Sequence, residues 1–219
     1  MKIKSCLILM SSTDVKCKIL IDIGCFNART GSITYKLLKK KREHWKGYMI
    51  EPNPYMEEDI KHNLKDTDYT YHQIGISDEI GTFDFYLGKY GFNNYRVKKQ
   101  MDKCMRSSLC NDKSFVKAHL TENKIQIKTE TLKSFIIKNE IKEIDLLKID
   151  TEGKDYDIIK NYFEDPLIYP KVILTEDVCK GVDEDIQRKI AEEKIQYLIS
   201  KGYQYENYDE YNSKFIYII

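Results

Sequence analysis

Apolar residues in this chain follow two alternating patterns: short continuous runs, and longer stretches where they recur at three- and four-residue spacing. Continuous runs are typical of buried strands, and the longer spacing is typical of amphipathic helices. The predicted strands cover residues 17–23, 48–50, 69–76, 144–149 and 172–176, and the predicted helices cover residues 32–41, 54–64, 132–139, 154–163 and 183–201. This alternation predicts an α/β fold with a mainly parallel sheet, in a single domain over residues 1–219.

Several segments depart from the alternation. Residues 82–87 and 125–131 carry apolar side chains at period two, which predicts an inserted antiparallel hairpin. A closing pair of strands is predicted at 203–208 and 215–219, and residues 3–10 offer a further strand. In the last helix, Ile186, Ile190, Ala191, Ile195 and Leu198 form one stripe that is expected to face the core.

The connection over residues 88–124 is long, polar and irregular, and it is basic and aromatic between residues 89 and 106. Long connections in compact domains are commonly lids or binding loops. We therefore expect a substrate loop or lid here, with a nucleic-acid surface as the alternative.

Charge and cysteine usage restrict the function classes. The chain has 36 basic and 35 acidic residues, so it has no global field for nucleic acid or an anionic membrane. No segment approaches the roughly 18 to 20 apolar residues that span a bilayer, and residues 6–10 are too short for a secretory segment. The six cysteines lack zinc-ligand spacing and are predicted to be reduced thiols in the cytoplasm.

The first apolar run leads into a turn with the features of a ligand site. Asp22 and Gly24 end the run, and the turn continues through Cys25, Phe26, Asn27 and Ala28. A strand, a tight turn and a helix bring backbone N–H groups up to a ligand, and glycine permits a close approach. The alternative is a strand-turn-helix unit that binds nothing. Cys25 is expected to be a small packing residue rather than a nucleophile.

Acids also follow the other predicted central strands. Glu51 ends the second strand, where a carboxylate can accept hydrogen bonds from both hydroxyls of a ribose. Asp150 and Glu152 follow the fourth strand, and Glu176 and Asp177 follow the fifth. Parallel strands end at one edge of a sheet, so these carboxylates are expected to meet there. Such a cluster can hold ribose hydroxyls, a cationic group, a divalent metal or the proton of a reacting hydroxyl.

Taken in order, these segments resemble the FkbM-type S-adenosylmethionine-dependent methyltransferases. The resemblance covers about residues 18–178 and rests on Asp-Ile-Gly-Cys-Phe-Asn-Ala, Ile-Glu-Pro-Asn-Pro, Gly-Ile-Ser-Asp-x-x-Gly-Thr-Phe, Ser-Ser-Leu, Thr-x-Thr-Leu and Leu-Lys-Ile-Asp-Thr-Glu-Gly. Ala28 stands where the family usually has glycine, a departure expected to weaken cofactor binding mildly. Residues 88–124 match poorly, so the substrate does not follow from the resemblance.

The resemblance implies a Rossmann-like class I methyltransferase domain: a mainly parallel seven-stranded sheet with an antiparallel terminal hairpin and an inserted hairpin. O-methylation is the usual activity, here of a sugar, glycan precursor or similar polyhydroxylated metabolite. The methionine end of S-adenosylmethionine would lie on the turn from Asp22 to Ala28. Glu51, beside Pro52, would hold the ribose, and the adenine would lie near Ile76, Ser77 and Asp78.

Methyl transfer to a hydroxyl needs a group that helps to remove the hydroxyl proton. Asp150 is the first candidate for this role, or for binding a metal that acidifies the hydroxyl, and it is also expected to contact the cofactor. Glu176 is the second candidate. Lys154 is a base only if its pKa is lowered, and an exposed helix lysine is the alternative. A likeness to catechol-type O-methyltransferases implies Asp150, Glu176 and Asp177 as possible Mg2+ ligands.

Three functions therefore stay open at this point. The leading prediction is the O-methyltransferase with a small-molecule or glycan hydroxyl acceptor. An RNA ribose or cap methyltransferase is the second, although the expected Lys-Asp-Lys-Glu set is not evident. A non-catalytic binding module that keeps the fold is the third. No membrane span is expected, and a homodimer is left open.

Overall fold

The computed structural model describes residues 16–29, 32–40, 42–88, 108–109, 120–177, 184–208 and 212–218. The strand predicted at residues 3–10 lies outside the described residues. The same holds for most of the predicted lid, including its basic segment between residues 89 and 106.

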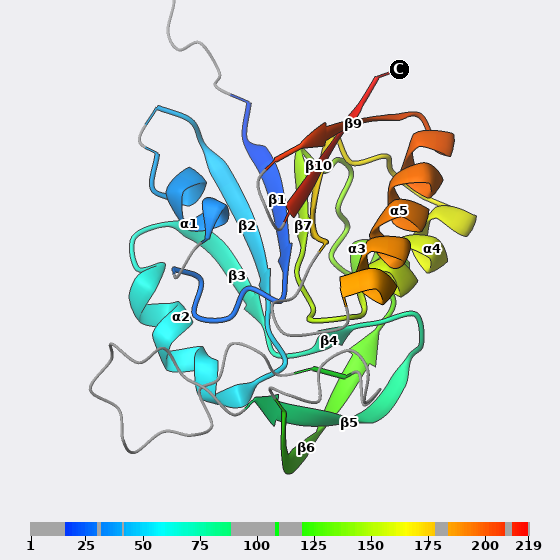
Figure 1. Cartoon of the computed structure of the whole chain (residues 1–219). Helices are drawn as coiled ribbons and strands as arrows, with labels where there is room; N and C mark the ends of the chain where they lie inside the picture. Colours follow the sequence, from blue (N-terminus) through cyan, green and yellow to red (C-terminus); the bar gives the residue numbers. More distant parts are fainter. Residues whose placement is uncertain are drawn as a thin grey trace, which may run out of the picture.

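A seven-stranded sheet forms the centre of the fold (Figure 1). Its strands are β1 Lys18–Ile23, β2 Trp45–Ile50, β3 Asp68–His72, β7 Leu146–Ile149, β8 Val172–Glu176, β9 Tyr203–Asn207 and β10 Asn212–Tyr217. Their order is β3-β2-β1-β7-β8-β10-β9, and β10 runs antiparallel to both β8 and β9. This arrangement confirms the predicted Rossmann-like methyltransferase fold with its terminal hairpin.

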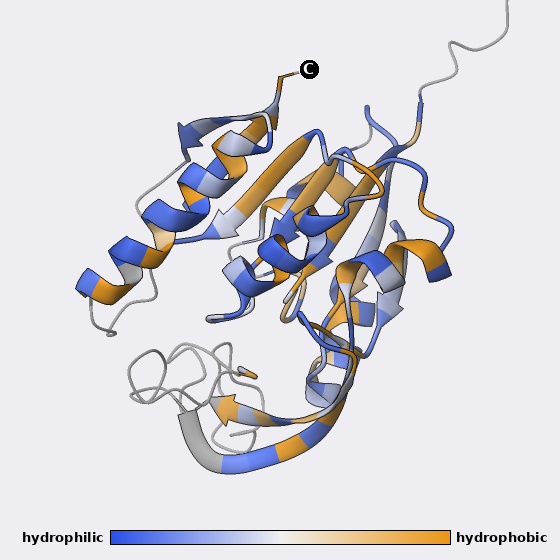
Figure 2. Cartoon of the chain, turned by 90° about the vertical axis from the view of Figure 1, so that its right-hand side faces the viewer, coloured by the Kyte–Doolittle hydropathy of each residue, from blue (hydrophilic) through white to orange (hydrophobic). Residues whose placement is uncertain are grey.

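The central strands are buried on both faces, which explains their continuous apolar runs. In β1, Leu20 faces one apolar cluster and Ile21 and Ile23 face the other. β1 pairs in parallel with β2 on one side and with β7 on the other. Figure 2 shows these apolar strands between amphipathic helices.

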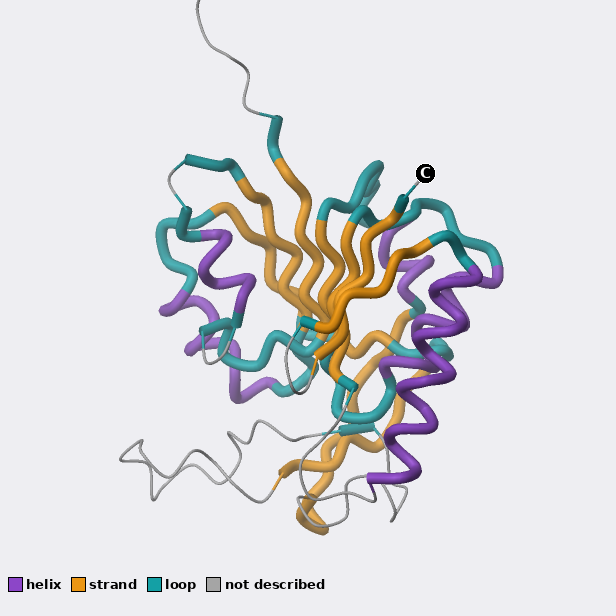
Figure 3. Tube along the Cα trace, turned by 45° about the horizontal axis from the view of Figure 1, so that its top comes forward, coloured by secondary structure: helices purple, strands orange, loops and turns teal. Residues whose placement is uncertain are grey.

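Helices cover the sheet from both sides (Figure 3). On one face lie α1 Ile33–Leu38, the 3-10 turn η1 Pro54–Met56 and α2 Glu57–Asn63; on the other lie α3 Leu132–Lys138, α4 Asp155–Glu164 and α5 Glu184–Ser200. Side-chain caps start α1 and α3, where Ser32 accepts from the Tyr35 N–H and Thr131 accepts from the Ser134 N–H. Among the described helices, none is both long and apolar enough to cross a membrane.

The strand predicted over residues 69–76 is wrong in one respect, because it is two strands in two sheets. β3 joins the central sheet, whereas β4 Gly75–Ile76 joins a small sheet of order β4-β6-β5. Its other members, β5 Gly81–Gly88 and β6 Leu120–Glu130, are the predicted inserted hairpin. Gly75 packs closely on β6, because a Cβ there would lie 3.0 Å from Ile127 Cδ1 and 3.1 Å from Thr129 Cγ2.

The predicted core stripe of the last helix also needs correction at one end. Leu198 and Ala191 are buried, but Ile186 is 41% exposed. Lys194 is only 2% exposed, although lysine is almost never fully buried unless it is paired. Its ammonium group lies 2.8 Å from Asp177 Oδ1 and donates to the Glu176 carbonyl at 2.5 Å, and these contacts account for its burial.

Candidate active site

A cavity lies at the carboxyl ends of β1, β2 and β7, next to the small sheet. The strand ends contribute Ile23, Gly24, Cys25, Phe26, Ile50, Glu51, Pro52, Lys148, Asp150, Thr151 and Glu152 to its lining, and other segments contribute Ser32, Ile74, Gly75, Ile76, Phe85 and Leu109. The structure therefore brings together seven of the predicted cofactor residues: Gly24, Cys25, Phe26, Glu51, Pro52, Ile76 and Asp150.

Gly24 sits where three strands end. Its N–H donates to the Ile50 carbonyl at 2.9 Å, which ties β1 to β2. A Cβ at Gly24 would lie 1.9 Å from the Asp150 carbonyl oxygen, and its φ is +77°. Only glycine fits this close approach of the two backbones, so the backbone itself forms the cavity wall here.

The turn after Gly24 uses left-handed backbone conformations. Phe26 has φ +48° and Ala28 has φ +53°, values that glycine adopts most easily. Ala28 is fully buried in the core, and its N–H donates to the Cys25 carbonyl at 2.8 Å. Asn27 accepts from the Arg29 N–H at 3.0 Å. Asn27 and Ala28 thus shape the turn and are not among the residues that line the cavity, and their predicted contact with the cofactor stays a prediction.

Cys25 combines a place in the cavity wall with burial. Its side chain is 5% exposed and packs in the same apolar cluster as Ala28. Burial raises the pKa of the Cys25 thiol well above its usual range, and the charges of Asp22 and Glu51 raise it further. A thiol that keeps its proton fits the predicted packing role rather than a nucleophile.

Glu51 is buried, 7% exposed, and held at both carboxylate oxygens. Oε2 accepts from the Phe26 N–H at 2.9 Å, and Oε1 accepts from the Asn53 N–H at 2.9 Å. Burial raises the pKa of Glu51 to about 7 against these two hydrogen bonds. A carboxylate oxygen has two acceptor sites, so each oxygen can also receive a ligand hydroxyl from the cavity.

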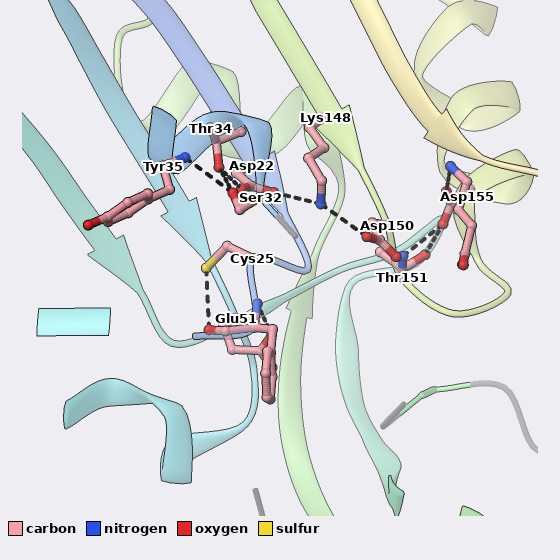
Figure 4. A network of polar contacts seen from close by, with 12 residues as sticks. Asp22, Cys25, Ser32, Thr34, Tyr35, Glu51, Lys148, Asp150, Thr151 and Asp155 are labelled. Atoms are coloured by element: carbon pink, nitrogen blue, oxygen red, sulfur yellow. Dashed lines mark hydrogen bonds and ion pairs between the residues drawn. The ribbon is translucent and has the colours of Figure 1, made fainter. Parts of the chain in front are cut away.

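A lysine that the sequence analysis did not single out connects two of the predicted acids (Figure 4). Lys148 Nζ lies 3.2 Å from Asp22 Oδ1 and 3.1 Å from Asp150 Oδ2. Burial alone would lower the pKa of Lys148, but the charges of Asp150 and Asp22 raise it instead, so the ammonium form persists. A charged residue inside the apolar run Leu-Leu-Lys-Ile was the signal that could have identified it.

Asp22 lies beneath the cavity wall rather than in it. It is fully buried and accepts a hydrogen bond from Thr34 Oγ1 at 2.6 Å. The Ser32 hydroxyl in turn contacts the Thr34 hydroxyl. Asp22 was predicted as a cofactor residue, but it does not line the cavity, and Lys148 stands between it and Asp150.

Three acids meet beside the cavity, although they are not the three predicted as magnesium ligands. Asp150, Glu152 and Glu176 each offer a carboxylate oxygen within 4.8 Å of the others. Asp177, predicted with Asp150 and Glu176, instead pairs with Lys194 and accepts from the Ser213 hydroxyl. Carboxylates suit Mg2+, and a metal at this position stays a prediction.

Lys154 and its neighbours lie away from the cavity lining. Lys154 Nζ is 3.3 Å from Asp78 Oδ1 and 2.9 Å from Asp157 Oδ2. Burial would lower the pKa of Lys154, but these carboxylates outweigh that effect and raise it. The condition for Lys154 as a base, a lowered pKa, is therefore not met. Ser77 donates to Asp78 at 2.8 Å, and of the three predicted adenine residues the cavity lining includes Ile76.

Two residues beside the cavity, Ser108 and Asp155, were not assigned a role from the sequence. Ser108 is buried, exchanges two backbone hydrogen bonds with Tyr86, and donates from Oγ to the Glu152 carbonyl at 2.8 Å. The next residue, Leu109, reaches the lining. Asp155 accepts from the Thr151 N–H at 2.9 Å and from the Glu176 N–H at 3.3 Å, which joins the ends of β7 and β8.

Comparison with known proteins identifies one family. The sequence matches the model described as the methyltransferase FkbM domain over residues 22–205. The SAH-bound methyltransferase PaMTH1 from Podospora anserina is 8% identical, with a TM-score of 0.46 over 92% of this chain and 72% of the other. Precorrin-6y C5,15-methyltransferase from Geobacter metallireducens GS-15 is 13% identical, with a TM-score of 0.44 over 91% and 80%. No curated protein matches the sequence.

Proposed function

Because this chain belongs to the FkbM methyltransferase domain family, we propose that it transfers a methyl group from S-adenosylmethionine to a hydroxyl of a sugar or similar polyhydroxylated metabolite. The family match supports the coarser activity, a methyltransferase that depends on S-adenosylmethionine. The acceptor and the transfer to oxygen are our proposal.

The observation that carries the cofactor assignment is the buried carboxylate of Glu51 in the cavity wall. Two backbone N–H groups fix its orientation and leave acceptor positions on both oxygens. A ribose presents two adjacent hydroxyl donors, which match two acceptor oxygens on one carboxylate. Gly24, which has no side chain, lets a ligand approach the backbone next to Glu51. The methionine group attached to the adenosine of S-adenosylmethionine would need this space.

The acids at the cavity support the proposed acceptor class. Asp150 and Glu152 line the cavity, and Glu176 lies within 4.8 Å of both at its carboxylate. Carboxylates accept hydrogen bonds from hydroxyls and repel phosphates. This charge favours a neutral, hydroxyl-rich acceptor over the phosphodiester backbone of RNA.

In the reaction, S-adenosylmethionine supplies an electrophilic methyl group on a sulfonium sulfur. The acceptor oxygen forms a bond to this methyl carbon while the bond from carbon to sulfur breaks, and S-adenosylhomocysteine leaves. Asp150 would orient the acceptor hydroxyl and take its proton, either directly or through water. Orientation of the oxygen at about 3 Å from the methyl group supplies much of the rate increase in such reactions.

Calorimetric titration of S-adenosylmethionine and S-adenosylhomocysteine into the purified chain tests the cofactor site. We expect binding by the wild type and at least about a tenfold loss in Glu51→Ala, because hydrogen bonds to a charged group contribute roughly 1.5–3 kcal/mol each. Glu58→Ala is the matched control, since Glu58 is an exposed glutamate on α2. Equal affinity in Glu51→Ala and the wild type would contradict the ribose assignment.

A panel of hydroxylated acceptors, beginning with amino and deoxy sugars, then tests the chemistry. The Asp150→Asn variant should bind the cofactor and lose turnover. Repeating the titration with Mg2+ tests the metal prediction, because any heat from magnesium binding should disappear in Asp150→Asn. Cofactor binding without turnover on any acceptor would favour the non-catalytic module.

A further inference from the structure

Lys148 is placed to contact a ligand as well as its two partner acids. It lies on β7, with Asp22 of β1 beside it in the sheet register. Its side chain is 16% exposed, and the residue lines the cavity. An ammonium group has three N–H donors, and two are directed at Asp22 Oδ1 and Asp150 Oδ2. One donor therefore remains for a group that enters the cavity.

Charge in the cavity wall identifies what that group would be. Among the described residues that line the cavity, Glu51, Asp150 and Glu152 are acidic, and Lys148 is the single cation. An anionic group is repelled by these acids, and among these lining residues the charged donor that it can reach is the third N–H of Lys148. A cationic group is attracted by the neighbouring acids. The wall thus suits a zwitterion whose negative end reaches Lys148.

We propose that Lys148 binds the carboxylate of the methionine moiety of S-adenosylmethionine. The proposal rests on the proposed function, and it adds a residue that recognises the amino-acid end of the cofactor. Glu51, at the end of β2, would hold the ribose of the cofactor, whereas Lys148, on β7, would hold its carboxylate (Figure 4). The turn from Gly24 to Phe26 contacts both sides in space, because the Phe26 N–H donates to Glu51 Oε2 and Gly24 packs against the Asp150 carbonyl.

The competing explanation is a purely structural lysine that neutralises Asp22 and Asp150. Two ligands separate the explanations. S-adenosylhomocysteine contains the amino-acid end, whereas 5′-methylthioadenosine keeps the adenosine and the sulfur but lacks the carboxylate and the amino group. A structural lysine affects both ligands equally, and a carboxylate-binding lysine affects only the first.

The experiment compares both ligands by calorimetry on the wild type, Lys148→Met and Lys148→Arg. We expect Lys148→Met to weaken S-adenosylhomocysteine about 10- to 100-fold, the range for a charged hydrogen bond, with little change for 5′-methylthioadenosine. Lys148→Arg keeps the charge and should retain part of the selectivity. Glu51→Gln is the reference variant, because it should weaken both ligands.

Removal of Lys148 leaves Asp22 buried without its cation, which destabilises the fold. The double variant Asp22→Asn/Lys148→Met removes that charge and serves if the single variant does not fold. Equal weakening of both ligands, or no weakening, overturns the inference while the proposed function stands. Failure of the wild type to bind either ligand overturns both.

Discussion

Glu51 is the site residue whose charge changes within the physiological pH range, because burial raises its pKa to about 7. An unfolded chain returns this pKa to about 4.3. The folded state therefore holds the proton more tightly than the unfolded state. The resulting contribution to stability is present below about pH 4 and is lost as the pH rises through about 7.

We expect the free energy of unfolding of the ligand-free protein to fall by up to about 3 kcal/mol between pH 5 and 8 from this group, at 1.36 kcal/mol per pKa unit. Urea denaturation of the wild type and Glu51→Gln across this range measures it. The glutamine variant should lack this decline, and Glu58→Gln should follow the wild type. Parallel profiles for the wild type and Glu51→Gln would contradict the raised pKa.

At the residue scale, the sequence predicted what backbone geometry determines and missed what side-chain direction determines. Gly24 and Glu51 were predictable because the end of a buried strand fixes where they lie. The direction of the Asp78 side chain was not predictable, because a residue at a turn can face a ligand or a neighbouring side chain, and here it faces Lys154. Lys148 was overlooked because its partners come from residues 22 and 150, and sequence distance does not show that contact.

The elements meet at points where a few backbone contacts join one strand end to the next. Gly24 is the tightest such contact, since a Cβ would overlap the Asp150 carbonyl. Gly24→Ala should lower the free energy of unfolding by at least about 2 kcal/mol. This is the cost of holding alanine in a left-handed conformation added to the cost of displacing the end of β7. Thermal unfolding measures this change. Ala28→Gly is the matched control, because it eases a positive φ in the same turn and should stay close to the wild type.

The small sheet is joined to the β7 loop through Ser108. Its hydroxyl donates to the carbonyl of Glu152, a residue held at φ +54°. Ser108→Ala would leave this partly buried carbonyl without that donor, at a cost of about 1 kcal/mol. We expect a lower melting temperature and weaker binding of S-adenosylhomocysteine, because Glu152 and Leu109 both line the cavity. Ser134→Ala on α3 is the control, and an equal melting temperature in both variants would contradict the link.

At the scale of the whole molecule, the alternation of strands and helices predicted the α/β class, and the family resemblance supplied the seven-stranded sheet with its antiparallel terminal hairpin. The split of residues 69–76 between two sheets was not predictable, because the period-two pattern is the same on either side of the split. The close packing of Gly75 on β6 depends on residues more than fifty positions away. Alternation along one segment shows which residues face together, but it does not show which sheet they join.

Lys194 joins the last helix to the end of the strand that carries Glu176. It extends from α5 to Asp177 at the end of β8, and Asp177 also accepts from Ser213 on β10. The ion pair is largely buried from solvent, with side-chain exposures of 3% for Lys194 and 14% for Asp177. Removal of one partner of a buried pair typically costs 3–5 kcal/mol, because the other charge is left uncompensated.

Lys194→Met should therefore destabilise the protein by about 3 kcal/mol, at the low end of that range since Ser213 still donates to Asp177. Lys189→Met, an exposed lysine on the same helix, should unfold like the wild type. The double variant Asp177→Asn/Lys194→Met should recover part of the loss, because the Asp177 charge is then removed together with its partner. Binding of S-adenosylhomocysteine should change little in the folded variant, since neither residue lines the cavity. Urea denaturation and calorimetry together check this prediction, and a Lys194→Met variant as stable as the wild type would contradict it.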